Sequence, residues 1–275
     1  KAIITGGSRG IGKAVAKKFL ENGAEVLLVS RGERELENSR AELSKLGKVH
    51  AIVADVSSET DVKKVSAKAQ TLWGEVSILV NAAGIYGPIG PLTEIEPAEW
   101  KKTIDINLLG SFLMIKNVAP LIPEDGRGRI INFVGGGEEA YPNFTAYVSA
   151  KGGIARLSET VAAELKKQKI GVNAVAPGPV NTQLLEELLT AGPDKVGPEN
   201  YARALKQKAG GGVGTEPVAA LCLFLASDES RGLSGKIFSA VWDDIEKLKA
   251  HQSEISNSDI YTYRRIKPED RGLSW

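Results

Sequence analysis

The chain has 275 residues, of which 42% are hydrophobic and 25% are charged, and its formal net charge is +1. This composition is typical of a globular protein with a sizeable core. A net charge near zero gives no reason to expect a nucleic acid or an anionic membrane as partner. We also see no apolar stretch of the ~18 to 20 residues that cross a bilayer.

The single cysteine, Cys222, lies in an apolar run and cannot form a disulfide within the chain, which suits a reducing cytoplasm. We therefore expect a cytoplasmic protein. His50 and His251 form no ligand cluster with cysteine or acidic residues, so no metal site is expected.

Short β-branched or apolar runs alternate with longer amphipathic stretches along the chain. The predicted strands are residues 2–5, 25–29, 49–54, 77–81, 129–134, 171–176 and 236–240. The predicted helices are residues 11–21, 34–46, 60–72, 97–118, 146–167 and 217–226. This alternation predicts an α/β fold, an open, doubly wound parallel sheet with helices on both faces.

Two segments fall outside this alternation. Residues 1–240 show no break in composition and are predicted to form one domain. Within it, residues 182–214 are long and marked by glycine and proline, which favours a mobile flap. Residues 241–275 form a polar extension that we expect to pack on the domain or on a subunit interface, because it contains several aromatic side chains. These are Trp242, Tyr261, Tyr263 and Trp275.

A glycine-rich motif, Thr5-Gly6-Gly7-Ser8-Arg9-Gly10-Ile11-Gly12, follows the first strand and opens the first helix. Glycines let the backbone approach a pyrophosphate, and the helix amino terminus offers free N–H groups. The strand–turn–helix context is the one that this motif requires for dinucleotide binding.

The end of the second strand indicates which dinucleotide binds. NAD-binding chains usually place an acid there to accept from the ribose 2′-hydroxyl. This chain has Ser30 and Arg31, with no acid until Glu33, and Arg9 lies in the glycine loop. Two guanidiniums and a hydroxyl suit a 2′-phosphate, so we predict NADP over NAD.

Tyr147 and Lys151 are the reactive candidates. Their i, i+4 spacing places both on one face of the predicted helix. An adjacent ammonium, together with a positive nicotinamide, is expected to lower the tyrosine pKa and make Tyr147 a general acid/base.

Five motifs in this order resemble the short-chain dehydrogenase/reductase family over roughly residues 1–240. They are Thr5–Gly12, Asn81-Ala82-Ala83-Gly84, Asn107 within 105–110, Tyr147-x-x-x-Lys151 and residues 176–182. The resemblance implies a Rossmann-like seven-stranded sheet. It also implies hydride transfer between NAD(P)(H) and a carbonyl/alcohol pair.

The resemblance also implies residue roles and a homo-oligomer, a tetramer or dimer built on the helices that contain Asn107 and Tyr147. Tyr147 is the implied proton donor and acceptor. Lys151 holds the nicotinamide ribose, and Asn107 anchors a proton-relay water. The expected cofactor-binding residues are Gly6, Ser8, Arg9, Gly10, Ile11, Gly12, Ser30, Arg31, Asp55, Val56, Asn81, Ala82, Gly84, Tyr147, Lys151, Pro177, Gly178, Val180 and Thr182.

One departure concerns the serine that this family places about a dozen residues before the tyrosine. The corresponding position falls on Val134 or Gly135, and neither carries a hydroxyl. Thr145 or Ser149 supplies the hydroxyl from another direction, or backbone N–H groups of Gly135–Gly137 replace it. Otherwise the enzyme is weak or serves another role.

We therefore expect an NADP(H)-dependent oxidoreductase of a small carbonyl or alcohol substrate. The alternative is a dinucleotide-binding regulatory or scaffold protein with little or no turnover. The sequence names neither the substrate nor the direction of reaction.

Overall fold

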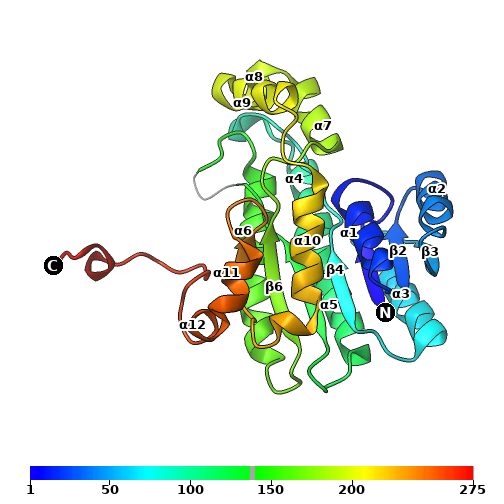
Figure 1. Cartoon of the computed structure of the whole chain (residues 1–275). Coiled ribbons are helices and arrows are strands. Elements are labelled where there is room, and N and C mark those ends of the chain that lie inside the picture. The colour runs from blue at the N-terminus through cyan, green and yellow to red at the C-terminus, as the bar shows by residue number, and fades with distance from the viewer. Residues whose placement is uncertain (137–139, 275) are drawn as a thin grey trace.

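The computed structural model describes residues 1–136 and 140–274. Its centre is a seven-stranded parallel sheet in the order β3-β2-β1-β4-β5-β6-β7 (Figure 1). The strands are β1 Ala2–Thr5, β2 Val26–Ser30, β3 Val49–Val53, β4 Ile78–Asn81, β5 Arg129–Phe133, β6 Gly171–Ala176 and β7 Ile237–Ser239. This architecture confirms the predicted Rossmann-like α/β fold. The strand order changes direction between β1 and β4, the place where such sheets bind ligands.

Helices cover both faces of the sheet because successive strand side chains point to opposite faces. Ile4 and Leu28 are buried in one core, and Ile3 and Leu27 in the other. The first core is covered by α1 Gly10–Glu21, α2 Glu33–Leu43 and α10 Thr215–Ala226. The second is covered by α3 Glu59–Trp73, α5 Gly110–Val118 and α6 Thr145–Glu164. Helix α4 Pro97–Ile104 packs against α6. Packing in these two cores holds the strands in place and so fixes the position of the carboxyl edge of the sheet.

The stretch predicted as one helix over residues 97–118 is interrupted. Asp105–Leu109 forms a π-helical turn between α4 and α5, and Asn107 lies within it. Such turns insert an extra residue and are frequent at functional sites. Contrary to the expectation from apolar runs, Pro97–Leu121 is long and apolar enough to cross a membrane by length and composition. In this fold 44% of that apolar window is buried, and its inner side packs in the core, with Met114 and Val118 fully buried.

Three short helices form the flap at the carboxyl edge of the sheet (Figure 1). They are α7 Gln183–Ala191, α8 Pro193–Val196 and α9 Pro198–Ala209. The two ends of the flap are joined at its base, because Val180 and Val213 form a β-bridge and Val213 N donates to Pro179 O at 3.0 Å. The mobility of this flap remains a prediction.

The carboxyl-terminal extension covers the outer edge of β7. It contains α11 Ile245–Ala250 and α12 Gln252–Ser256. The Nζ of buried Lys236 donates to Ser258 O at 2.7 Å and to Ile260 O at 3.0 Å. Ile237 N donates to Tyr261 O at 2.8 Å, so the exposed edge of the sheet is covered.

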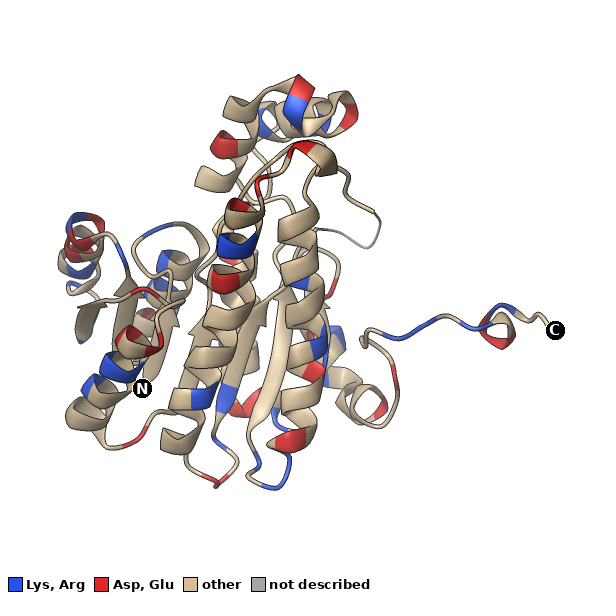
Figure 2. Cartoon of the chain, turned by 180° about the vertical axis from the view of Figure 1, so that it is seen from behind, with Lys and Arg blue, Asp and Glu red and all other residues tan. Residues whose placement is uncertain are grey.

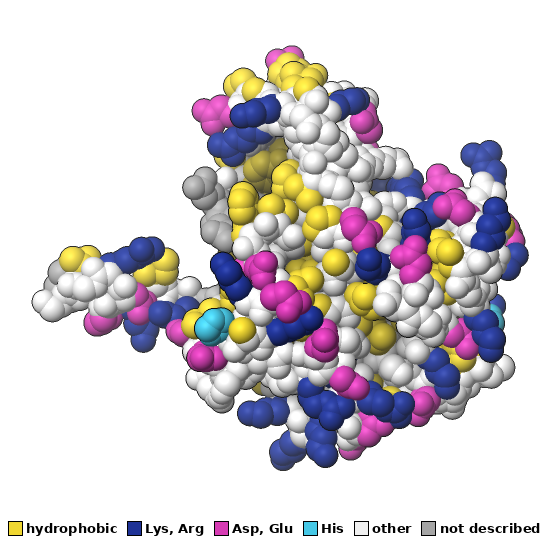
Figure 3. Space-filling view, viewed as in Figure 1, with side chains coloured by type: hydrophobic (Ala, Val, Ile, Leu, Met, Phe, Trp, Pro, Cys, Tyr) yellow, Lys and Arg dark blue, Asp and Glu magenta, His cyan; other side chains and the backbone are white. Residues whose placement is uncertain are grey.

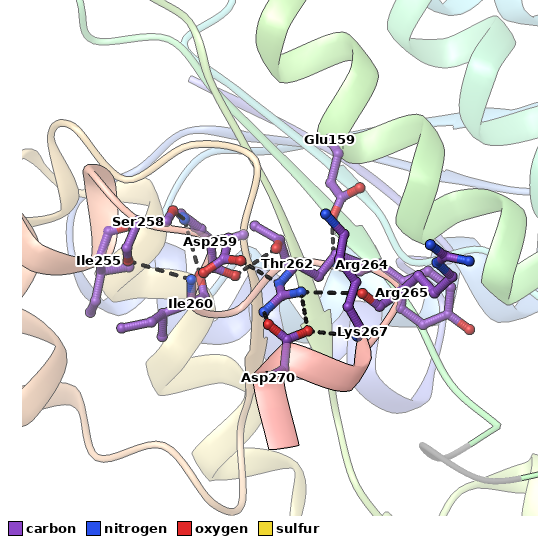
Figure 4. A network of polar contacts seen from close by, with 12 residues as sticks. Glu159, Ile255, Ser258, Asp259, Ile260, Thr262, Arg264, Arg265, Lys267 and Asp270 are labelled. Atoms are coloured by element: carbon purple, nitrogen blue, oxygen red, sulfur yellow. Dashed lines mark hydrogen bonds and ion pairs between the residues drawn. The ribbon is translucent and has the colours of Figure 1, made fainter. Parts of the chain in front are cut away.

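Beyond residue 263 the chain leaves the body of the molecule as an arm (Figures 1 and 2). Arg264 organises the arm through ion pairs with Asp259 and with Asp270, the latter at 2.6 Å (Figure 4). The side chain of Trp242 is 83% exposed and that of Tyr263 58% exposed. Trp275 lies outside the described residues, and the proposed role of the extension in packing stays a prediction.

Candidate active site

The glycine-rich loop between β1 and α1 brings bare backbone to the carboxyl edge of the sheet. Gly6 has φ +66°, and a β-carbon there would lie 2.8 Å from Ala82 O. A β-carbon on Gly12 would lie 2.3 Å from Gly6 O. Side chains are therefore excluded at both positions. Arg9 precedes α1 and gives it no side-chain cap, so the first N–H groups of the helix are available to an anion.

A cleft of about 860 Å³ opens above this loop, a volume within the range that binds small molecules and cofactors. The excluded side chains and the open helix terminus fit a dinucleotide pyrophosphate. The predicted cofactor-binding residues that line the cleft are Gly6, Ser8, Arg9, Gly10, Ile11, Gly12, Ser30, Arg31, Val56, Ala82, Gly84 and Thr182. Flap residues Asn181–Glu187 and Lys208 line it too. Among these flap residues, only Thr182 was predicted to bind the cofactor. The amphipathic pattern of α7 was the signal available for the others.

The other predicted cofactor-binding residues are not on the cleft wall: Asp55, Asn81, Tyr147, Lys151, Pro177, Gly178 and Val180. Gly178, with φ +73°, packs on Val241, since a β-carbon there would lie 2.3 Å from Val241 Cγ2. Val180 is buried at the base of the flap, in the bridge to Val213. Residues 177–180 therefore lie in the turn that joins β6 to the flap.

Both predicted phosphate-selecting arginines have acidic neighbours. Arg31 lies 3.6 Å from Asp55, and Arg9 lies 3.5 Å from Glu35. Burial raises the pKa of the Asp55 carboxyl, but hydrogen bonds from Ser57 and the charge of Arg31 outweigh it and hold that pKa below its usual value. Both arginine side chains are 52% exposed, so these pairs are weak and open to competition from a stronger anion.

Two serines join the glycine loop to the end of β2. The Oγ atoms of Ser8 and Ser30 lie 3.0 Å apart, and both residues line the cleft. This hydrogen bond joins two hydroxyls, each of which directly precedes one of the two arginines, Arg9 and Arg31. The sequence indicated Ser30 as a ribose contact, but not its bond to Ser8.

Asn81 lies inside the sheet. Its side chain is 4% exposed, and its Nδ2 donates to Asn132 Oδ1 at 2.9 Å. Asn132 Nδ2 in turn donates to Ser158 Oγ at 2.9 Å. The next residues, Ala82–Gly84, reach the cleft, and Ala83 N donates to Thr5 Oγ1 at 3.1 Å. The side chain of Asn81 thus ties β4 to β5, and the backbone after it forms the wall.

Asn107 clamps the loop that follows β4. Its Oδ1 accepts from Ile85 N and its Nδ2 donates to Ile85 O, both at 2.9 Å. A β-carbon on Gly84 would lie 3.2 Å from Asn107 Oδ1 and 3.8 Å from Lys151 Nζ. The π-helical turn, the loop and α6 therefore meet at Gly84. The side chain of Asn107 therefore positions this loop. Its implied role as anchor of a proton-relay water stays a prediction.

Tyr147 and Lys151 lie one turn apart on α6, and both are buried. Lys151 Nζ donates to Phe133 O at 2.8 Å and lies 5.8 Å from the centre of the Tyr147 ring. Burial lowers the pKa of the Lys151 ammonium to about 8. Burial also raises the pKa of the Tyr147 hydroxyl, which is opposite to the expected direction. The predicted lowering of the Tyr147 pKa relied partly on the positive charge of a bound nicotinamide. The chain itself does not carry that charge.

Gly135 is the residue that faces the Tyr147 hydroxyl. A β-carbon at Gly135 would lie 2.5 Å from Tyr147 Oη, whereas Val134 is buried beside Ile154. Of the alternative hydroxyl donors, Ser149 is exposed and Thr145 is half-buried at the start of α6. Gly137, the last residue of the glycine turn, lies outside the described residues.

An aromatic contact with Tyr147 was missed by sequence reasoning. The ring of Tyr86 meets that of Tyr147 edge to face, with ring centres 4.8 Å apart. Tyr86 directly follows the residue that Asn107 clamps. Its position after Gly84-Ile85 was the signal available, but the contact joins residues 61 positions apart in the chain.

No group of three or more His, Cys, Asp or Glu side chains within residues 1–136 and 140–274 is arranged to hold a metal ion.

The chemistry that this geometry supports is proton transfer by a buried tyrosine, Tyr147, beside Lys151. Both lie next to a cleft whose shape fits a dinucleotide.

Comparisons with known proteins agree with this geometry. The model of the family described as short chain dehydrogenase matches residues 1–191. The chain is 36% identical to Short-chain reductase protein NovJ of Streptomyces niveus over 240 residues, which cover 86% of this chain and 90% of the relative. It is 33% identical to 3-oxoacyl-[acyl-carrier-protein] reductase FabG of Thermotoga maritima over 237 residues, covering 86% and 93%.

Solved structures of the same type superpose on this chain. Levodione reductase matches with a TM-score of 0.79 and 28% identity, covering 86% of this chain and 94% of that one. NAD⁺-bound xylitol dehydrogenase matches with a TM-score of 0.79 and 26% identity, covering 86% and 96%. The chain belongs to the short-chain dehydrogenase/reductase family and is an oxidoreductase of alcohol and carbonyl groups.

Proposed function

We propose that the chain transfers a hydride between NADP(H) and a carbonyl/alcohol substrate, with Tyr147 as general acid/base. The observation that carries this proposal is the position of the Tyr147 hydroxyl, which lies against Gly135. Tyr147 shares helix α6 with Lys151. Lys151 and Asn107 both approach Gly84, at the wall of the cleft. The proton donor Tyr147, the cation Lys151 and the cleft wall at Gly84 therefore lie close together at the edge of the sheet.

The nicotinamide cofactor, when bound, supplies or accepts the hydride. In the reductive direction the carbonyl carbon receives the hydride, the C=O π electrons move to oxygen, and that oxygen takes the proton from Tyr147 Oη. In the oxidative direction Tyr147 takes the proton back. The ammonium of Lys151 stabilises the phenolate left after proton donation. Asn107 holds Ile85, and through it Gly84, in place beside these groups.

The backbone of Gly135 and Gly136, in the turn after β5, replaces the hydroxyl donor that the family places here. Tyr147 Oη lies next to the backbone at Gly135, so a substrate oxygen bound to Tyr147 lies near this backbone. Thr145 is a poorer candidate, because residues two apart on a helix do not face each other. We propose that the turn stabilises the substrate oxygen through backbone N–H groups, as an oxyanion hole does.

We propose NADP(H) as the preferred cofactor because Ser30 and Arg31 end β2 and line the cleft together with Arg9. Their acidic neighbours do not remove this preference. A dianionic 2′-phosphate attracts an exposed guanidinium more strongly than a single carboxylate 3.5–3.6 Å away.

We also propose a cytoplasmic enzyme that forms a dimer or tetramer through the helices that hold Asn107 and Tyr147. Leu109 and Phe112 on this layer are 37% and 42% exposed, and a β-carbon on Gly152 would meet no atom within 4 Å. An apolar and partly bare helix surface of this kind suits packing against a second copy. The single thiol, Cys222, is buried, which suits a reducing compartment.

The proposed chemistry is tested with Tyr147→Phe. We follow NADPH absorbance with a panel of ketones, sugars and ketoacyl thioesters, and NADP⁺ reduction with the matching alcohols. The variant should lose turnover by ~10³-fold or more while its NADPH affinity stays close to that of the parent. Tyr263→Phe, which alters an exposed tyrosine on the arm, is the matched control. Turnover by Tyr147→Phe at the parent rate, or cofactor binding with no turnover by the parent, contradicts the proposal.

A further inference from the structure

An aromatic cluster includes the ring of Tyr147. We define it as Tyr86, Tyr141, Phe144 and Tyr147. Tyr86 meets Tyr147 and Phe144 edge to face, with ring centres 4.8 Å and 5.3 Å apart, and Tyr141 stacks on Phe144 at 4.3 Å. These are the geometries that aromatic rings prefer. Two loops that are distant in the sequence therefore build one aromatic wall.

The flap closes this wall from above with aliphatic side chains. Leu185 and Leu188 of α7 and Val196 of α8 are buried in the same core as Phe144 and Tyr147. Leu189 and Tyr201 are partly buried against it. Figure 3 shows hydrophobic side chains gathered below α8 and α9, where the surface is hollowed. The substrate side of Tyr147 is thus bounded by apolar groups from both the domain and the flap.

Charged groups lie outside this wall. Glu187 and Arg203, whose charges act on Tyr86 and Tyr141 respectively, are both exposed on the flap. Burial raises the pKa of the Tyr86 hydroxyl and of the Tyr141 hydroxyl, as expected in a site of low polarity. A charged substrate group would lose its hydration here without a buried ionic partner from Glu187 or Arg203, which is costly. The buried ammonium beside Tyr147, that of Lys151, donates to Phe133 O at 2.8 Å.

We propose that the site takes an uncharged carbonyl compound, or the matching alcohol, whose reacting carbon carries an aromatic or similar planar apolar ring. The ring lies against Tyr86 and beneath Leu185 and Leu188, and the substrate oxygen reaches Tyr147 Oη. This inference rests on the proposed function, since it names the substrate class of the same site. Tyr86 is its specificity-determining residue, because it contacts both the proton donor and Phe144.

The test compares three substrates of eight carbons in the full-length protein with NADPH: acetophenone, 2-octanone and phenylglyoxylate. The corresponding alcohols are oxidised with NADP⁺, so that the direction of reaction does not decide the result. We expect kcat/KM for acetophenone to exceed that for 2-octanone by ~10-fold and that for phenylglyoxylate by ~100-fold.

Tyr86→Leu should reduce the preference for acetophenone over 2-octanone by ~10-fold, and Tyr86→Phe should retain it, because the ring and not the hydroxyl makes the contact. Leu205→Ala, on an exposed part of α9, is the control and should leave the ratio unchanged. Cofactor affinity and the thermal midpoint are measured for each variant, so a folding defect in Tyr86→Leu is recognised, and the substrate ratios of the parent then decide the inference.

Preferred turnover of 2-octanone or phenylglyoxylate overturns this inference and leaves the proposed function standing. An equal loss for all three substrates in Tyr86→Leu, without a change in fold, also overturns it. Cofactor binding without turnover of these compounds or of the broader panel overturns the proposed function as well.

Discussion

The hydroxyl oxygen of Tyr147 lies against the backbone of Gly135, so near that a β-carbon at position 135 would stand 2.5 Å from it. The ring of Tyr147 cannot move away freely, because Tyr86 packs on it. The glycine at position 135 therefore leaves room for the Tyr147 hydroxyl next to the place that the β-carbon of a serine would occupy. The absence of a side chain here is part of how the site is built.

Gly135→Ala should displace the Tyr147 hydroxyl. We expect kcat to fall by ~10²-fold, the loss associated with a displacement of about 1 Å at a reacting group, with little change in NADP⁺ affinity. Steady-state kinetics and a cofactor titration measure the two effects. Gly214→Ala is the control, because a β-carbon there would lie 4.0 Å from its nearest neighbour, Glu216 N. It should retain activity. Full activity in Gly135→Ala would show that Tyr147 has room to adjust.

Lys151 should make the stability of the fold depend on pH. Burial lowers the pKa of its ammonium to about 8 in the folded chain, below its ordinary value of 10.5. Between these two values the unfolded chain holds a proton that the folded chain has released, so the free energy of unfolding rises with pH. Below pH 8 the burial cost is fully present.

Lys151→Met removes this cost along with the hydrogen bond to Phe133 O. Relative to the variant, the parent should therefore gain ~1–3 kcal/mol between pH 7.5 and pH 10.5. Urea denaturation across this range measures the difference, and Lys45→Met, at an exposed position, should show no such trend. Parallel curves for the parent and Lys151→Met would mean that the ammonium is hydrated in the folded state.

Arg31→Asp should change the cofactor preference. The new carboxylate repels a 2′-phosphate and can accept from the ribose 2′-hydroxyl, while the cation beside Asp55 is lost. We expect the ratio of kcat/KM for NADP⁺ over NAD⁺ to fall by ~10- to 100-fold, as for the loss of a charge-assisted contact. Arg271→Asp, on the arm, gives the same change of charge far from the cleft and should leave the ratio unchanged. An unchanged ratio in Arg31→Asp refutes the assignment of Arg31.

The fold and the cofactor loop were predictable because their signals are local. A strand, a glycine turn and a helix occur in sequence between Thr5 and Gly12, and the spacing of Tyr147 and Lys151 follows from helix geometry alone. The family resemblance then supplied the roles. None of this required knowledge of which distant residues touch.

What could not be predicted depends on contacts between distant segments. Asn107, in the π-helical turn, binds Ile85, which lies 22 positions earlier. The inward position of Asn81 depends on Asn132, 51 positions later. The sequence shows that Arg31 and Asp55 are charged, but only the pairing of β2 with β3 brings them together. Such pairings are set by strand order, which no single motif encodes.

Lys236→Met should loosen the carboxyl-terminal extension. The buried ammonium donates to Ser258 O and Ile260 O, so its removal leaves two carbonyl groups without this donor next to β7. We expect a loss of ~1–3 kcal/mol in the free energy of unfolding and faster proteolysis between residues 257 and 263. The NADP⁺ affinity should be retained, because the cleft is lined by residues at the ends of β1 to β4, whereas β7 is the edge strand on the far side of β5 and β6. Lys48→Met, at an exposed position, is the control. Unchanged proteolysis in Lys236→Met would mean that the lysine is not needed to hold the extension. The hydrogen bond from Ile237 N to Tyr261 O and the burial of Ile255 would then be sufficient.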